Sequence, residues 1–195
     1  AAWKDATPEI KKEIMDFAEG YMRFLDDAKT EREAVRTIVS MADAAGFRNI
    51  NDAAELKPGD CVYGVNKNKS IYLAVIGKQP LTQGFNAVGA HIDAPRLDLK
   101  QNPLYEDSGL ALLKTHYYGG IKKYQWTTVP LALHGVVALT DGTVVDVKIG
   151  EDENDPVFLV TDLLPHLAAK QNAKKLAEGV PAENLNILIG SMPGE

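Results

Sequence analysis

The first fifty residues carry the apolar spacing of amphipathic helices. Thr7 followed by Pro8 is typical of a helix N-cap with proline in the first helical position. A second helix is predicted from the capping-box residues Thr30 and Glu33 to a stop at Gly46. The apolar positions that predict the buried faces recur at steps of three and four: Ile10, Ile14, Phe17, Tyr21, Phe24 and Leu25 in the first helix, then Val35, Ile38, Val39 and Ala42 in the second.

After Lys57 the pattern changes to short apolar runs, rich in β-branched and aromatic residues and divided by turn residues. The first two runs are expected to form a hairpin, and Asp141-Gly142 marks the turn of another. The small, apolar run 86–90 is typical of a buried strand in a sheet covered by helices. Residues 163–177 have helical composition. The predicted strands are 61–65, 71–76, 86–90, 131–139, 143–149, 157–160 and 185–189.

These elements divide the chain into a half with helices and then a sheet, and a mostly β half. The change in pattern near Asn102-Pro103 places the boundary, which gives predicted domains 1–102 and 103–195. A β-rich module entered directly from the end of a buried strand favours a domain inserted into an α/β catalytic domain. The expected fold class is therefore α/β, with the C-terminal remainder of the host domain missing.

Composition excludes several classes of partner. A formal net charge of -6, without clustered Lys and Arg, argues against binding to nucleic acid. No window holds the roughly 20 apolar residues of a membrane span, and the first residues lack a basic stretch leading into an apolar one. The single cysteine, Cys61, forms no internal disulfide, as is usual in reducing compartments. We expect a cytoplasmic protein with no membrane partner.

Among the four histidines, His91 has the most informative setting. It follows the predicted strand 86–90, and open α/β sheets gather ligand-binding groups at the carboxyl ends of their strands. Asp93, two residues later, could accept a hydrogen bond from the ring nitrogen that does not bind the metal. The pair thus suggests a metal ligand with its orienting carboxylate. Taken alone, however, a His-Asp pair at a strand end is more often a structural hydrogen bond.

The other candidate residues have weaker local support. His166 follows a proline near a predicted helix, which by itself favours a local hydrogen bond. His116 lies beside two tyrosines, and His134 lies in a predicted strand with alternating apolar residues. Packing is the common role of a histidine in either setting. Ser108 lacks the strand-to-helix elbow and the histidine partner of a nucleophilic serine. Trp126 favours an aromatic anchor over a place in a substrate pocket, and the scattered glycines do not form a phosphate loop.

Three blocks in order make the chain resemble the aspartyl aminopeptidases, a family that includes the yeast vacuolar aminopeptidase. The likeness runs through essentially the whole chain, and three separate blocks in register outweigh the structural interpretation of His91. The blocks are Val88-Gly89-Ala90-His91-Ile92-Asp93-Ala94-Pro95-Arg96-Leu97, then Tyr117-Tyr118-Gly119-Gly120 with Lys123-Tyr124-Gln125-Trp126, and Leu164-Pro165-His166-Leu167-Ala168.

The resemblance implies an exopeptidase that removes N-terminal, preferentially acidic, residues from peptide substrates with two Zn2+ ions, Co2+ or Mn2+ being alternatives. It assigns His91 as a metal ligand and Asp93 as its support. It places His166 near the substrate carbonyl of a neighbouring subunit, in homodimers that assemble into dodecamers through the inserted dimerisation domain. The other metal ligands and the general base are expected beyond residue 195, so this chain alone is expected to be inactive.

Two other functions stay open on the sequence. The chain could serve as a non-catalytic assembly or interaction module, built from the N-terminal half and the insertion. It could also be an unrelated small-molecule-binding α/β protein. A catalytic zinc site generally uses three protein ligands, so His91 by itself does not separate these possibilities.

Overall fold

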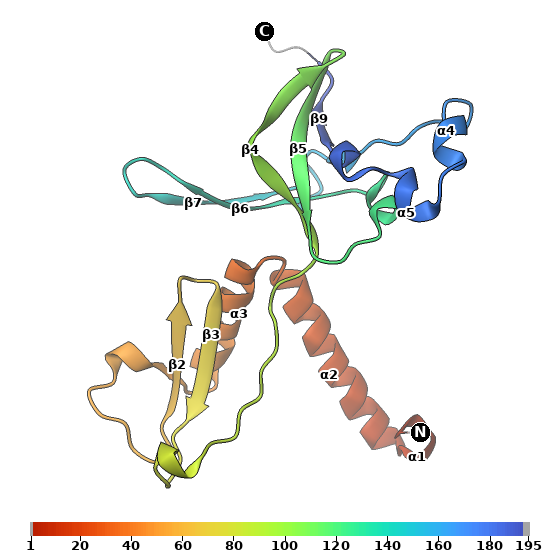
Figure 1. Cartoon of the computed structure of the whole chain (residues 1–195). Coiled ribbons are helices and arrows are strands. Elements are labelled where there is room, and N and C mark those ends of the chain that lie inside the picture. Colours follow the sequence, from red (N-terminus) through yellow and green to blue (C-terminus); the bar gives the residue numbers. More distant parts are fainter. Residues whose placement is uncertain (1, 193–195) are drawn as a thin grey trace. The chain divides into compact units, whose positions relative to one another are not determined.

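The computed structural model describes residues 2–192 and contains both helices and strands. The chain forms two compact units, one up to Asp93 and one from Ala94 onward. The elements of each unit are labelled in Figure 1, and each unit is described by itself. The first unit contains the two longest helices and one small sheet, and the second is mostly β.

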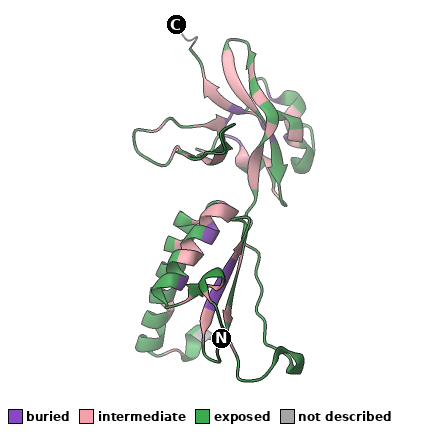
Figure 2. Ribbon diagram, turned by 90° about the vertical axis from the view of Figure 1, so that its left-hand side faces the viewer, coloured by how far each residue is buried: buried purple, intermediate pink, exposed green. Residues whose placement is uncertain are grey.

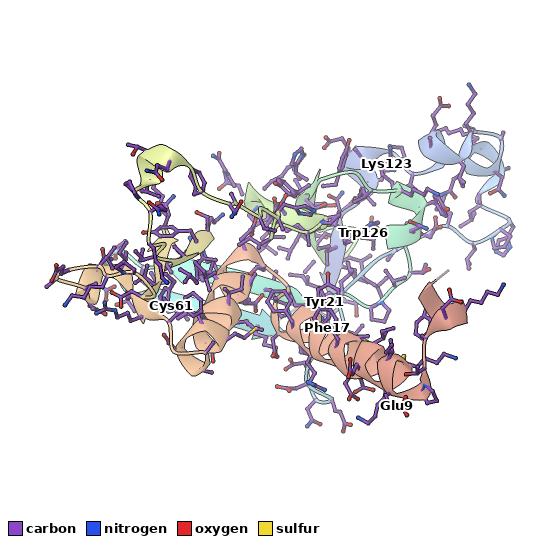
Figure 3. All side chains as sticks on the ribbon, turned by 90° about the horizontal axis from the view of Figure 1, so that it is seen from below. Glu9, Phe17, Tyr21, Cys61, Lys123 and Trp126 are labelled. Atoms are coloured by element: carbon purple, nitrogen blue, oxygen red, sulfur yellow. The ribbon has the colours of Figure 1, made fainter. Side chains whose placement is uncertain are left out.

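The two predicted helices are confirmed, but only one of them buries its apolar face. After the short α1 (Ala2–Asp5), α2 spans Pro8–Asp27 and α3 spans Glu31–Ala44. Helix α3 buries Ala34, Val35 and Ala42, whereas no described residue of α2 is buried. Phe17, for example, is 79% exposed, and Figure 3 shows it with Tyr21 on α2. The expectation of a buried face on α2 was therefore wrong, because the contacts of α2 with α3 leave most of its apolar side chains exposed.

The capping box that starts α3 supports a stability prediction. Thr30 Oγ1 accepts from Glu33 N at 3.3 Å, and Glu33 Oε2 accepts from Thr30 N at 2.9 Å. Thr30→Ala should lower the free energy of unfolding by about 1 kcal/mol, as measured in denaturant. Thr7→Ala is the matched control, since Thr7 caps α2, which buries nothing. Equal effects of the two substitutions would contradict the prediction.

The sheet of the first unit has the strand order β1-β2-β3. Strand β1 runs parallel to β2, and β2 pairs with β3 as the predicted antiparallel hairpin. Its buried positions lie on β2, at Val62, Tyr63 and Gly64, and α3 packs beside β2 and β3. The purple segments in Figure 2 mark these buried positions. The elements are β1 (Arg48–Asn49), η1 (Ile50–Asp52), β2 (Cys61–Asn66), β3 (Ser70–Val75) and η2 (Leu81–Gln83).

The predicted strand 86–90 is absent. These residues are irregular and exposed, and Val88 has no burial at all. In Figure 1 they form part of the yellow-green segment that follows η2. A strand is stabilised by hydrogen bonds to a neighbouring strand, and within residues 2–192 the sheet of the first unit ends without pairing to this segment. Apolar composition alone therefore did not make it a strand.

The second unit is built on a four-stranded sheet with the order β4-β5-β9-β8 and a separate hairpin, β6 with β7. Its core consists of the buried Val160, Val180, Leu185 and Ile187, against which Trp126 and other apolar side chains pack. The elements are β4 (Arg96–Asp107), β5 (Leu110–Tyr118), η3 (Lys123–Trp126), β6 (Leu133–Ala138), β7 (Val144–Ile149), β8 (Leu159–Val160), α4 (Ala169–Asn172), α5 (Leu176–Gly179), η4 (Ala182–Asn184) and β9 (Ile187–Gly190).

The hairpin of β4 and β5, the longest strands of the described residues, was not predicted. Its pairing shifts between Leu99 and Leu104, and Pro103, which has no N–H to donate, lies in this irregularity. The change in pattern near Asn102-Pro103 is thus an irregularity inside a strand. The compact units instead meet between Asp93 and Ala94. The hairpin predicted around Asp141-Gly142 is confirmed as β6 and β7, and the last predicted strand as β9.

The predicted helix 163–177 was also wrong. Only the four-residue helices α4 and α5 form in and beside this range, with extended backbone at Lys175 between them. Pro165 disfavours helical backbone at the residue before it. The leucines of the segment, among them Leu163 and Leu176, are exposed. A helix of this length gains most of its stability from a packed apolar face, which this segment does not have.

No helix among residues 2–192 has the length and apolar character needed to cross a lipid bilayer.

Candidate metal-ligand and oxyanion residues

The structure brings the ring of His91 and the carboxylate of Asp93 together. His91 Nδ1 lies 3.0 Å from Asp93 Oδ1 and 2.9 Å from the Asp93 carbonyl oxygen. Both residues belong to the irregular segment that precedes β4. The His91 side chain is 83% exposed and the Asp93 side chain 37%. The ring is therefore held by one neighbouring residue while its other edge remains accessible.

These two contacts determine which ring nitrogen carries the proton of a neutral imidazole. Both partners of Nδ1 are oxygens that accept hydrogen bonds, so Nδ1 must donate. The proton of a neutral His91 is then on Nδ1, and Nε2 keeps a free lone pair. A carboxylate that holds a histidine in this way is the usual support of a zinc-binding imidazole.

His91 fits the chemistry of one zinc ligand and supplies only part of a site. An imidazole nitrogen is a common zinc donor, and catalytic sites generally combine three protein ligands with an open position. Within residues 2–192, His, Cys, Asp and Glu side chains nowhere gather in a group of three that could bind a metal ion. His91 is thus a candidate ligand whose companions are not among the described residues.

His166 lies in the second unit, in an exposed turn between β8 and α4. Leu167 N donates to Leu164 O at 2.9 Å and Ala168 N to Pro165 O at 3.3 Å, so the backbone around His166 is locally ordered. Among the described residues its imidazole makes no hydrogen bond or ion pair. The local hydrogen bond that the sequence favoured for His166 is therefore not formed, and the ring is accessible to a ligand.

Asp162 fixes the start of the His166 turn and was missed by the sequence reasoning. Its Oδ1 accepts from Leu163 N at 2.8 Å and from Gln171 Nε2 at 2.9 Å. Its Oδ2 lies 3.5 Å from Thr127 Oγ1. Aspartate side chains commonly accept from nearby backbone N–H groups where a strand leads into a turn, so an aspartate between the apolar run 157–160 and Pro165 was a signal that could have revealed it.

The hydrogen bonds to Asp162 also keep it ionised. The Gln171 amide, followed by the Leu163 N–H, holds the pKa of Asp162 below its ordinary value, against a smaller opposing effect of burial. A depressed folded-state pKa means that the ionised form stabilises the fold above the unfolded-state pKa, and that this stabilisation is lost as pH falls through the folded-state pKa. At neutral pH the turn is therefore tied to α4 by a charged carboxylate.

The remaining candidates have structural partners. His134, whose side chain is only 8% exposed, contacts Glu151 Oε1 through Nε2 at 2.9 Å, and His116 stacks on Tyr117 at 5.8 Å between ring centroids. Ser108 lies in the turn between β4 and β5, where its hydroxyl donates to Asp107. Trp126 packs against the core from η3 and is labelled in Figure 3, which confirms the aromatic anchor.

Comparison with known proteins places these residues in a family. The profile described as Aminopeptidase I zinc metalloprotease (M18) matches residues 24–193. A probable M18 family aminopeptidase 1 of Clostridium acetobutylicum is 53% identical over 196 aligned residues, covering 98% of this chain and 42% of that protein. The chain thus spans less than half the length of this curated relative.

Solved structures agree with the sequence comparison. The crystal structure of an M18 family aminopeptidase from Thermotoga maritima matches with a TM-score of 0.89 and 44% identity, covering 98% of this chain and 41% of that one. A more distant structure, described as the S. cerevisiae mApe1 dodecamer, shares the fold with a TM-score of 0.67 at 18% identity, covering 91% and 39%. From the profile and the 53% identical relative, the chain belongs to the M18 family of aminopeptidase I zinc metalloproteases.

Proposed function

We propose that the full-length protein is a zinc-dependent aminopeptidase that removes single residues, preferentially acidic ones, from peptide N-termini. Family membership supports the class of enzyme. The observation that carries the proposal within this chain is the pairing of His91 Nδ1 with Asp93, which leaves Nε2 available to a metal.

In this proposal His91 contributes one zinc ligand and Asp93 holds its ring and tautomer. When bound, a pair of zinc ions polarises the scissile carbonyl and lowers the pKa of a water molecule, so that hydroxide is available near neutral pH. His166 donates a hydrogen bond to the carbonyl oxygen as negative charge develops on it. Because three ligands are usual for a catalytic zinc site, residues 1–195 alone are inactive in this proposal.

We further propose that the protein acts as a homo-oligomer and that the second unit carries the dimerisation surface. The distant relative described as a dodecamer supports assembly in proteins of this fold. Within this chain, the hairpin of β6 and β7 exposes apolar side chains on both strands, namely Val137, Val144 and Val145. An exposed apolar surface of this kind often marks a site of protein contact.

The proposal is tested by assaying the full-length protein on N-terminal amino-acid p-nitroanilides. Aspartyl and glutamyl substrates should be cleaved with a higher kcat/KM than the leucyl substrate. Dialysis against a chelator should abolish cleavage, and added zinc should restore it, whereas residues 1–195 alone should show none. Chelator-resistant cleavage would contradict the metal mechanism, and an equal or better leucyl substrate would contradict the acidic preference alone.

A further inference from the structure

The second unit has an open pocket of about 440 Å³ beside the turn that carries His166. Leu163, Pro165 and Ala168 of that turn line it, and α4 and α5, seen in Figure 1, contribute to its other walls. We call it the α4–α5 pocket. The polar and charged side chains of its lining include Asp162, Gln171, Asn172, Lys174 and Lys175.

Asp162 holds the walls of the α4–α5 pocket together and does not offer a free charge to a ligand. Its carboxylate accepts from Leu163 N and Gln171 Nε2, at 2.8 Å and 2.9 Å, and lies 3.5 Å from Thr127 Oγ1. It therefore joins the His166 turn, α4 and the residue after η3. These donors compensate its negative charge, so it repels an incoming anion less than a free carboxylate would.

Two lysines give the α4–α5 pocket a positive character. Lys174 and Lys175 lie between α4 and α5 and line the pocket, and both are exposed. Across residues 2–192 neither ammonium group has an ion-pair partner. Asp162 is the one acidic residue of the lining, and Glu178 of α5 is not part of it. In a chain with a formal net charge of -6, a site with two available cations favours an anionic ligand.

The apolar part of the lining indicates what accompanies the anion. Of the lining residues, Ala168 and Val180 are buried, whereas Leu163 and Leu176 expose their side chains. Asn172 adds an amide that can donate or accept. A small inorganic anion would leave these apolar groups uncovered, whereas a peptide brings carboxylates and apolar side chains together.

We propose that the α4–α5 pocket is an accessory site that binds a peptide through its carboxylates, with Lys174 and Lys175 as the recognising groups. The choice of a peptide as ligand rests on the proposed peptidase function. The site lies beside His166, within the second unit. Side-chain carboxylates and a C-terminal carboxylate share the chemistry that the two lysines recognise.

Binding is tested on the full-length protein by fluorescence anisotropy with a labelled hexapeptide that has two adjacent glutamates between leucines. The peptide is acetylated at its N-terminus, which prevents aminopeptidase cleavage, and amidated at its C-terminus. A second peptide has glutamines in place of the glutamates, and a third is this glutamine peptide with a free C-terminal carboxylate. The second and third peptides distinguish side-chain from terminal carboxylates.

At low salt, at least one carboxylate-bearing peptide should bind about tenfold more tightly than the amidated glutamine peptide, because exposed ion pairs to the two lysines make a modest contribution to affinity. The difference should shrink as salt is added. In the double variant Lys174→Gln/Lys175→Gln the difference in affinity should disappear. The matched control Lys67→Gln/Lys69→Gln removes the same charge at the turn between β2 and β3, and its difference in affinity should be unchanged.

A second measurement does not depend on any variant. Bound peptide should protect Lys174 and Lys175 from chemical acetylation, as mapped by mass spectrometry, and should leave Lys170 on α4 as reactive as before. Equal binding of all three peptides, an unchanged difference in the Lys174/Lys175 variant, or no protection of these lysines would overturn the proposal. Since the assay measures binding without turnover, such a result would leave the proposed peptidase activity standing.

Discussion

Replacing His91 by alanine in the full-length protein is expected to abolish peptidase activity and to lower zinc content. The structure gives the physical reason, because Nδ1 is occupied by Asp93 at 3.0 Å and Nε2 is left as the metal donor. Alanine removes that donor entirely. Zinc should be measured by elemental analysis after equilibrium dialysis, and activity on the N-terminal p-nitroanilide that the unmodified protein cleaves best.

Asp93→Asn tests the contact between His91 Nδ1 and the Asp93 carboxylate without removing the proposed metal ligand. An amide can still approach Nδ1, but it lacks the charge that raises the basicity of Nε2. We expect zinc affinity or activity to fall by about 10- to 100-fold, which is typical of the loss of such a support. His116→Ala is the matched control, because His116 is also exposed and stacks on Tyr117 in the second unit. If His91→Ala retained the full zinc stoichiometry, the ligand assignment would be wrong.

Replacing His166 by alanine is expected to lower turnover by about 10² to 10³, the usual loss for one oxyanion donor. Zinc content and assembly should be unchanged, because His166 lies in an exposed turn of the second unit and its ring makes no hydrogen bond or ion pair to the described residues. Substrate binding should change little. His166→Asn keeps an N–H donor and should retain more activity than alanine if hydrogen-bond donation is the role of His166.

Mixing two inactive proteins tests whether His166 acts on a neighbouring subunit. A dimer formed from His91→Ala and His166→Ala chains can place an intact His91 opposite an intact His166. Part of the activity should then return on mixing. If subunit exchange is demonstrated and the mixture remains inactive, His166 acts within its own chain or supports only the fold.

Elements with local signals were predicted well, and those that depend on distant partners were not. Thr7 and Thr30 cap α2 and α3 as expected, since an N-cap acts within one helical turn. The turn at Asp141-Gly142 likewise set the β6 and β7 hairpin. The run 86–90 had the composition of a strand but lacks a partner within residues 2–192. The β4 and β5 hairpin went unrecognised because the irregularity at Pro103 interrupts its alternation.

The candidate site likewise has features that local sequence revealed and features that depend on distant residues. The sequence by itself singled out His91, Asp93 and His166, and it placed the chain in a family by three blocks of contiguous residues. A spacing of two residues also made the His91–Asp93 contact foreseeable. Their catalytic roles remain predictions, which the substitutions at His91, Asp93 and His166 test.

Only the tertiary structure decided which His91 nitrogen is free, because that depends on the rotamer of the ring and on the Asp93 carbonyl as well as its carboxylate. It also showed that Asp162 ties the His166 turn to Gln171 and Thr127, and that Lys174 and Lys175 share a pocket with that turn. The physical reason is that caps, turns and motifs act over a few residues, whereas pockets and hydrogen-bond networks join residues that only folding brings together.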